Sequence, residues 1–323
     1  MNDTGPKIEI FAPFGVAFEW MKTVLFRPFD FVKWLTIAFA AFIAGSWGGG
    51  FNFSRLGQFK GGDWKYNATR YGNWPGNWDA TPWVVAAVVV VFAFILVLSV
   101  AWMWVASRGR FVFTDCVVKN RAAIGEPWRE FRREGNSFFL FMLAVGLVTL
   151  VMVVIAGFFL WGIFGASDND GVRIGFVIGL IVVGVIWLAF ALLFAVVSQF
   201  MVPVMYRRRC LAREALIDVG RLIAANPAPF ILFVLFGLVL TVAVAVAGTV
   251  AACLTCCIGG LPYISTVLLL PAIVWLTAFK FLFLRQFGDQ YDVWAASGFP
   301  GNAIPPSDPP PPAMPLPPPI APA

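Results

Sequence analysis

The sequence contains no histidine and few charged residues of any kind. Charged side chains make up 12% of its 323 residues, compared with roughly 25% in a soluble globular domain. Histidine is the commonest general base and the commonest transition-metal ligand, so its absence argues against serine–histidine and zinc-hydrolase chemistry. We therefore expect no catalytic residue, no cofactor and no metal site, and the chain is predicted not to be an enzyme.

Long apolar runs dominate what is present. Hydrophobic residues make up 60% of the chain, and its mean hydropathy is +0.83. The clearest run, 83–107, has no charged residue and exceeds the roughly 20 residues that a helix needs to cross a bilayer. The prediction is an all-α, polytopic integral membrane protein with about six transmembrane helices in three hairpins. The spans are expected at about 31–47, 83–107, 137–164, 174–205, 229–257 and 261–284.

The basic residues predict how this bundle is oriented, because Lys and Arg in short loops favour the cytoplasmic side. Eighteen of them fall in segments on the same side as the N-terminus, and five fall on the opposite side. Both termini are therefore expected in the cytoplasm, with the chain in a bacterial cytoplasmic (inner) membrane. The net charge of +6 then indicates orientation and contact with anionic lipid rather than nucleic-acid binding.

A polar, amphipathic stretch precedes each predicted pair of spans. The three stretches are 16–28, 114–134 and 210–225. In the third, one helix face collects Leu211, Ala215, Val219, Leu222 and Ile223. Gly125 and Pro127 are expected to break the second stretch. The pattern predicts interfacial helices, which either dock a partner or pack against lipid head groups.

Three regions follow from this organisation. Residues 1–30 are expected to form a cytoplasmic segment with an interfacial helix, and residues 31–285 the six-span membrane domain. Residues 286–323 are expected to form a disordered, Pro-rich cytoplasmic tail that acts as a spacer or as a ligand for a partner. The Gly- and Asn-rich loop 48–82 is the one sizeable extracytoplasmic segment, and its role stays open.

Cys253, Cys256 and Cys257 cluster at the extracytoplasmic end of the fifth predicted span. We expect them to pack as small apolar residues, because cysteine lets helices approach closely. A disulfide between Cys253 and Cys257 is the alternative in an oxidising compartment.

The segments 25–39, 108–128 and 200–219 share juxtamembrane arginine, proline and aromatic residues. In these segments the chain resembles bacterial multi-pass proteins of unknown function, which are similar to the membrane domain fused to some glycerophosphodiester phosphodiesterases. The resemblance covers most of residues 10–295 and implies a shared six-span architecture. The soluble phosphodiesterase domain, with its histidine and acidic metal site, has no counterpart in this sequence, so no hydrolase residue carries over.

Two functions remain open at this stage. The first is a non-enzymatic scaffold or accessory protein whose basic cytoplasmic loops contact anionic lipid or a protein partner. The second is a transporter or channel for an apolar or lipid-like solute. Coupled transporters normally have ionisable groups inside their spans, and predicted spans two to five have none, which favours the first function. The predicted lipid head-group contacts are Arg129, Arg132, Arg133, Arg207, Arg208 and Arg209.

Overall fold

A computed structural model describes residues 11–45, 82–165, 170–254, 262–295 and 298. Within these ranges the chain is helical and contains no strand, which confirms the all-α prediction. The elements are α1 (Ala12–Phe26), α2 (Phe31–Gly45), α3 (Pro82–Val118), α4 (Gly125–Glu130), α5 (Arg132–Gly165), α6 (Asp170–Arg208), α7 (Ala212–Ala225), α8 (Pro227–Leu254), α9 (Pro262–Arg285) and the short 3-10 helix η4 (Asp289–Tyr291).

Five of these helices are long and apolar enough to cross a membrane: α3, α5, α6, α8 and α9. They correspond to the second to sixth predicted spans. The first predicted span coincides with α2, which has 15 residues and is therefore shorter than the roughly 20 that a bilayer requires. The described residues thus support a multi-pass membrane protein with five candidate spans.

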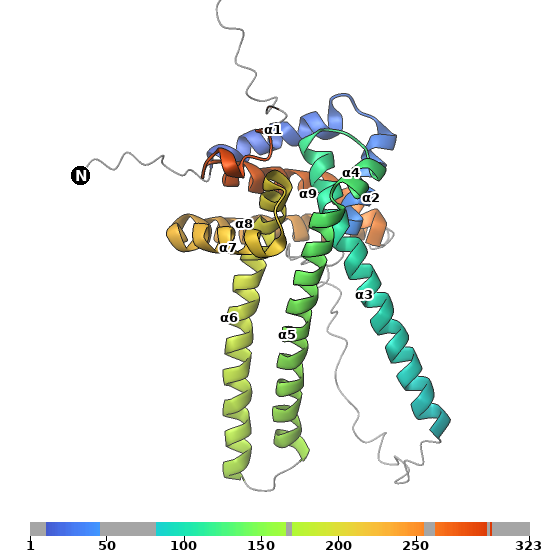
Figure 1. Ribbon diagram of the computed structural model, residues 1–323, viewed down its shortest axis with the longest axis vertical. Coiled ribbons are helices and arrows are strands. Elements are labelled where there is room, and N and C mark those ends of the chain that lie inside the picture. The colour runs from blue at the N-terminus through green and yellow to red at the C-terminus, as the bar shows by residue number, and fades with distance from the viewer. Residues whose placement is uncertain (1–10, 46–81, 166–169, 255–261, 296–297, 299–323) are drawn as a thin grey trace, which may run out of the picture.

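The molecule has two parts with different surfaces. Figure 1 shows α3, α5 and α6 projecting as a stalk from a group of packed helices, here called the head. The stalk comprises α3 before Ala106, α5 after Phe141 and α6 before Val197, and the head comprises the remaining described residues except α8. Buried residues concentrate in the head, among them Phe111, Phe138, Phe200, Met205, Phe279, Phe283 and Trp294. The stalk instead exposes Val, Leu and Ile side chains on most sides, as lipid-facing helices do.

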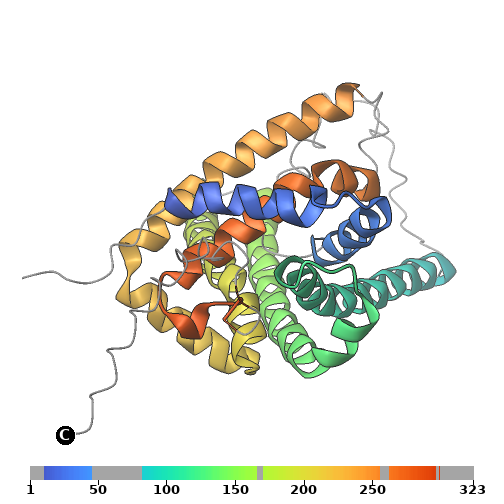
Figure 2. The same ribbon diagram turned by 90° about the horizontal axis from the view of Figure 1, so that it is seen from above.

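The centre of the head is α9, which packs along both α1 and α2. Trp275 of α9 donates a hydrogen bond from Nε1 to the Phe14 carbonyl oxygen of α1 over 3.2 Å. Trp34 of α2 donates to the Val267 carbonyl oxygen over 3.3 Å. Helices α1 and α2, the first two described, therefore lie beside α9, the last of the α-helices described, as Figure 2 shows for α1 and α9.

Close helix contacts join α2 to α3 and α5 to α6. A Cβ atom at Gly109 would lie 2.3 Å from Cγ2 of Ile43, so only glycine allows α3 to approach α2 this closely. A Cβ atom at Gly162 would lie 2.4 Å from the ring of Phe176, so the Phe176 side chain of α6 packs directly on the α5 backbone at this glycine. Small residues at such contacts are typical of membrane helices.

The sequence predicted three hairpins, and the third of them includes α8, whose direction differs from that of α5 and α6. Figures 1 and 2 show α8 running crosswise to α5 and α6. The backbone of Asn226 leaves the helical region between α7 and α8 (φ −133°, ψ 58°), so α8 starts in a new direction. Its first turns are then held on the head by aromatic contacts: the Phe233 ring centroid lies 4.4 Å from that of Phe283 and 5.2 Å from that of Phe279.

Each predicted amphipathic stretch overlaps a short helix: α1, α4 or α7. In α7, Ala215 and Val219 are buried while Leu222 and Ile223 pack against the core, as the predicted apolar face requires. The second stretch is divided as expected, although Gly125 and Pro127 begin α4 and the break lies at 119–124. Cys253 is exposed near the end of α8. Cys256 and Cys257, the tail from 299, and the 48–82 loop up to residue 81 fall outside the described residues.

Candidate functional site

Three helix ends meet on the side of the head away from the stalk: the end of α3 with α4, the start of α5 and the end of α6. An ion pair between Arg209, directly after α6, and Glu130, the last residue of α4, joins two of them. This arrangement gathers the predicted head-group contacts at one end of the molecule. We call that set the basic end, and its members are Arg129, Arg132, Arg133, Arg207, Arg208 and Arg209.

A buried carboxylate holds this end together. Asp115 in the last turn of α3 is fully buried, and its Oδ1 accepts a hydrogen bond from the Tyr206 hydroxyl of α6 over 2.9 Å. Lys119 Nζ lies 2.6 Å from the same oxygen, and Arg121 Nε donates to Oδ2 over 3.0 Å. A buried carboxylate needs such compensation because desolvation of an unpaired charge is costly. Asp115 therefore fixes the end of α3 against the end of α6.

The same contacts raise the pKa of Arg121. Burial alone lowers its pKa, but the hydrogen bonds and negative charges of Asp115 and Glu126 outweigh this effect, and the pKa is raised. The Arg121 Nη1 atom lies 2.8 Å from Oε2 of Glu126 in α4. Arg121 is thus a permanent cation that links α3 to α4.

Two members of the basic end have partners within the protein. The Arg209 guanidinium carbon lies 3.9 Å from the ring centroid of Phe131, and the side chain also pairs with Glu130. A left-handed backbone at Arg209 (φ 54°) ends α6. Arg208 pairs with Asp218 of α7. These two arginines position helices, so they are less free to bind a ligand than the sequence suggested.

The other four members are different. Arg129, Arg132 and Arg133 are exposed, and Arg207 is half-buried. In the part of the chain that the structure describes, no carboxylate lies within ion-pair distance of any of these four. They present four positive charges to whatever covers this end of the head.

Sequence reasoning missed the charged residues within α3. We expected the second span to end at 107, which placed Arg108 and Arg110 in a loop, whereas α3 continues to Val118. Arg108 is buried between Trp104 and Trp128, at 4.3 and 5.4 Å from their ring centroids, and its Nη2 donates to Asn136 over 2.8 Å. Asn120, which adopts the left-handed conformation (φ 52°) two residues after α3, was the available signal for the end of this helix, whereas Gly109 lies within it.

Comparisons with known proteins place most of the chain in one group. Residues 10–291 match the model of DUF7544, a family of unknown function. Neither a search of curated proteins nor a search of solved structures found a match. The expected similarity to the membrane domain fused to glycerophosphodiester phosphodiesterases has no support in these comparisons.

Proposed function

We propose that this chain, which belongs to the DUF7544 family of unknown function, is a non-enzymatic accessory protein of the bacterial cytoplasmic membrane. It contacts anionic lipid through its basic end. The four arginines without an internal partner are the observation that carries the proposal. Each basic group near a membrane surface contributes roughly 1 kcal/mol toward anionic lipid. Four such groups at one end of the head would therefore favour a bilayer that contains anionic lipid.

The proposal places the basic end and both termini on the cytoplasmic side. The split of eighteen basic residues against five supports this orientation, because the larger set includes the whole basic end. Arg173, at the start of α6, belongs to the smaller set and lies at the far end of the stalk from Arg207 and Arg208.

We further propose six spans in three pairs, α2 with α3, α5 with α6 and α8 with α9. The packing of α2 on α3 and of α5 on α6 supports the first two pairs. For the third pair, α8 must turn from its crosswise direction, and the non-helical backbone at Asn226 provides the place where it turns. The length and apolar surface of α8 favour a span, since 24 of its residues form a candidate crossing segment.

Reconstitution in nanodiscs tests the lipid contact. We expect the wild type to melt at a higher temperature in phosphatidylglycerol-containing nanodiscs than in pure phosphatidylcholine, with the difference shrinking as salt screens the charges. A variant with glutamine at all four unpaired positions should lose most of this difference. The four positions are Arg129, Arg132, Arg133 and Arg207.

Arg173→Gln is the matched control, because it removes an exposed charge from the opposite end of α6. It should melt like the wild type in both lipids. If the melting temperature of the wild type changes with neither lipid charge nor salt, the proposal is contradicted. The basic end would then serve orientation or a protein partner docking through the cytoplasmic loops or the Pro-rich tail.

A further inference from the structure

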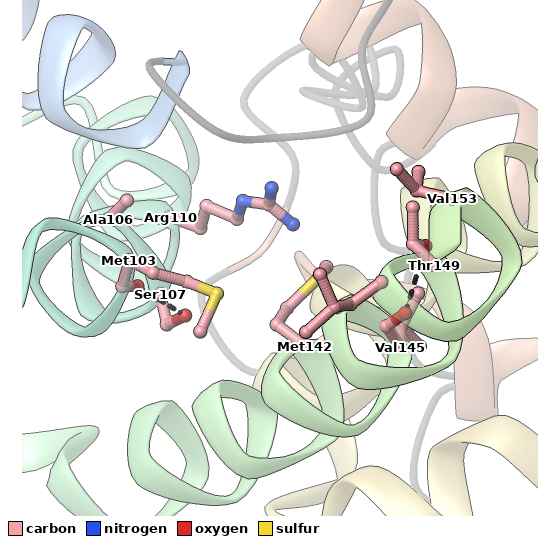
Figure 3. A pocket seen from close by; sticks show the side chains of 10 residues that line it. Met103, Ala106, Ser107, Arg110, Met142, Val145, Thr149 and Val153 are labelled. Carbon is pink, nitrogen blue, oxygen red and sulfur yellow. Dashed lines mark hydrogen bonds between the residues drawn. The ribbon is translucent and has the colours of Figure 1, made fainter. Parts of the chain in front are cut away.

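A cleft opens between α3 and α5 where the stalk meets the head (Figure 3). Its volume is about 430 Å³. Most of its wall is apolar, with Met103 of α3 and Met142 of α5 facing each other across it. The hydroxyls of Ser107 and Thr149 each donate to a carbonyl oxygen of their own helix, over 2.8 and 2.9 Å. Neither hydroxyl therefore needs a partner from the cleft.

Arg110 is the exception to this apolar lining. Figure 3 shows its side chain extending from α3 toward the space between the two helices. Its guanidinium carbon lies 4.9 Å from the ring centroid of Phe138. Among the described residues, no carboxylate and no hydrogen-bond acceptor pairs with this guanidinium. An arginine against an apolar wall is costly unless an anion compensates it, and such residues in membrane helices usually mark a site.

The position of the cleft indicates which anion fits. Arg110 stands eight residues before the end of α3 at Val118, which is about 12 Å along the helix. The apolar wall continues along α5 from Met142 to Val153, away from the head and into the exposed stalk. A ligand there needs one anionic group at Arg110 and an apolar chain along α5, and that combination is an anionic amphiphile.

We propose that this cleft binds one anionic membrane phospholipid, with the lipid phosphate at Arg110 and an acyl chain between Met103 and Met142. The site is separate from the basic end, which meets head groups at the surface. It rests on the membrane location in the proposed function but not on the four surface arginines, so each can fail without the other.

The test is a titration of the full-length protein in detergent micelles with phosphatidylglycerol or with phosphatidylcholine of the same acyl chains. Native mass spectrometry then counts the lipids retained. The wild type should retain one phosphatidylglycerol at about tenfold lower concentration than phosphatidylcholine, as expected for a charge-assisted contact. Arg110→Gln should abolish this preference, and Arg110→Lys should keep part of it because the charge remains.

The apolar half of the site has its own variant and control. A Cβ atom at Gly146, which lines the cleft, would meet no heavy atom within 4 Å, so Gly146→Leu adds a side chain to the space that the acyl chain would occupy. It should weaken retention of phosphatidylglycerol about tenfold, the effect of losing an acyl-chain contact of that size. Gly157→Leu, on the same helix beyond the cleft and equally unobstructed, should retain lipid like the wild type.

Three results would overturn the proposal: equal retention of both lipids by the wild type, an intact preference in Arg110→Gln, or unchanged retention in Gly146→Leu. If Arg110→Gln does not elute as a folded protein, the wild-type preference and the Gly146→Leu titration still decide. The glutamine variant of the four surface arginines separates the two proposals. Its retained phosphatidylglycerol should match the wild type even where its nanodisc stability no longer responds to lipid charge.

Discussion

The Asp115 carboxylate is the single residue on which the geometry of the basic end depends most. It is fully buried, and Lys119, Arg121 and Tyr206 all direct a polar hydrogen toward it. Lys119 and Arg121 keep about a third of their side chains exposed, so they can reach water if the carboxylate is removed. The loss of Asp115 should therefore cost less than that of a wholly buried ion pair.

Asp115→Asn should lower the free energy of unfolding by about 2 kcal/mol, below the usual range for a fully buried pair, because both cations lose their shared counter-charge. Thermal melting of the purified protein in lipid nanodiscs measures this change. Glu126→Gln is the control, since it removes the other carboxylate partner of Arg121. The Glu126 side chain is 67% exposed. That change should cost less than about 1 kcal/mol. Equal losses in the two variants would show that Asp115 has no special role.

The sequence predicted the six arginines of the basic end but not their different environments. Exposed positive charge is visible in composition and spacing, and the arginines do gather at one end of the head. The partners of Arg208 and Arg209, by contrast, come from α7 and α4, and the Asp115 contact to Tyr206 joins residues 91 positions apart. Pairings of that kind depend on how helices pack, which a single sequence does not reveal.

At the scale of the helices, Gly109 controls how closely α3 approaches α2. Besides the contact with Ile43, its Cβ would lie 3.3 Å from the backbone nitrogen of Ala44, which cannot move aside without shifting α2. Gly109→Ala should therefore lower the free energy of unfolding by about 1–3 kcal/mol, the usual cost of overpacking. Gly157→Ala is the matched control.

Alanine at Gly157 meets no atom within 4 Å and gains helix propensity, so it should leave stability unchanged or slightly raised. Melting curves of both variants in the same nanodiscs provide the comparison. A Gly109→Ala protein as stable as Gly157→Ala would mean that α2 is not packed on α3 as described.

The direction of α8 gives a second test at this scale. Spin labels at Leu232, Val242 and Val250 are separated by about 15 and 12 Å along the helix, and all three side chains are exposed. Six spans predict that Val242 lies deepest in the bilayer and that the outer two are shallow. A helix lying crosswise predicts one depth for all three. Oxygen and nickel-chelate accessibility in liposomes distinguishes these patterns.

Labels at Leu140, Leu150 and Leu160 of α5, which are also exposed, are the control, because the middle of that helix should lie deepest in either arrangement. Equal depth along α8, with Leu150 deeper than its two neighbours along α5, would contradict the third pair of spans. The chain would then cross the membrane without α8.

The apolar runs in the sequence predicted where these helices occur along the chain, but not the directions in which they run. Helix α7 was predicted at 210–225 and forms at Ala212–Ala225, because an amphipathic face is a local property of the sequence. The contacts that turn α8 across α5 and α6 involve Phe233 with Phe279 and Phe283, in a different helix. An apolar run predicts a helix that is buried or faces lipid. It does not predict on which side of the head that helix packs.

For the molecule as a whole, the separation of surfaces is the feature that relates structure to function. The stalk exposes apolar side chains, the buried core lies in the head, and unpaired arginines lie at one end of it. A bilayer around the stalk places the basic end near the lipid head groups. The proposed lipid contact requires this end to face the cytoplasm, because anionic lipid attracts juxtamembrane basic groups at the cytoplasmic leaflet.

Cysteine labelling in intact cells measures this directly. Arg213→Cys, near the basic end in α7, and Arg173→Cys, at the far end of the stalk, both place a thiol at an exposed position. They are compared in a background in which the five native cysteines are replaced by serine. If the basic end is cytoplasmic, a membrane-impermeant maleimide will label Arg173→Cys in intact cells and will label Arg213→Cys only after permeabilisation. Labelling of Arg213→Cys but not of Arg173→Cys in intact cells would contradict this orientation.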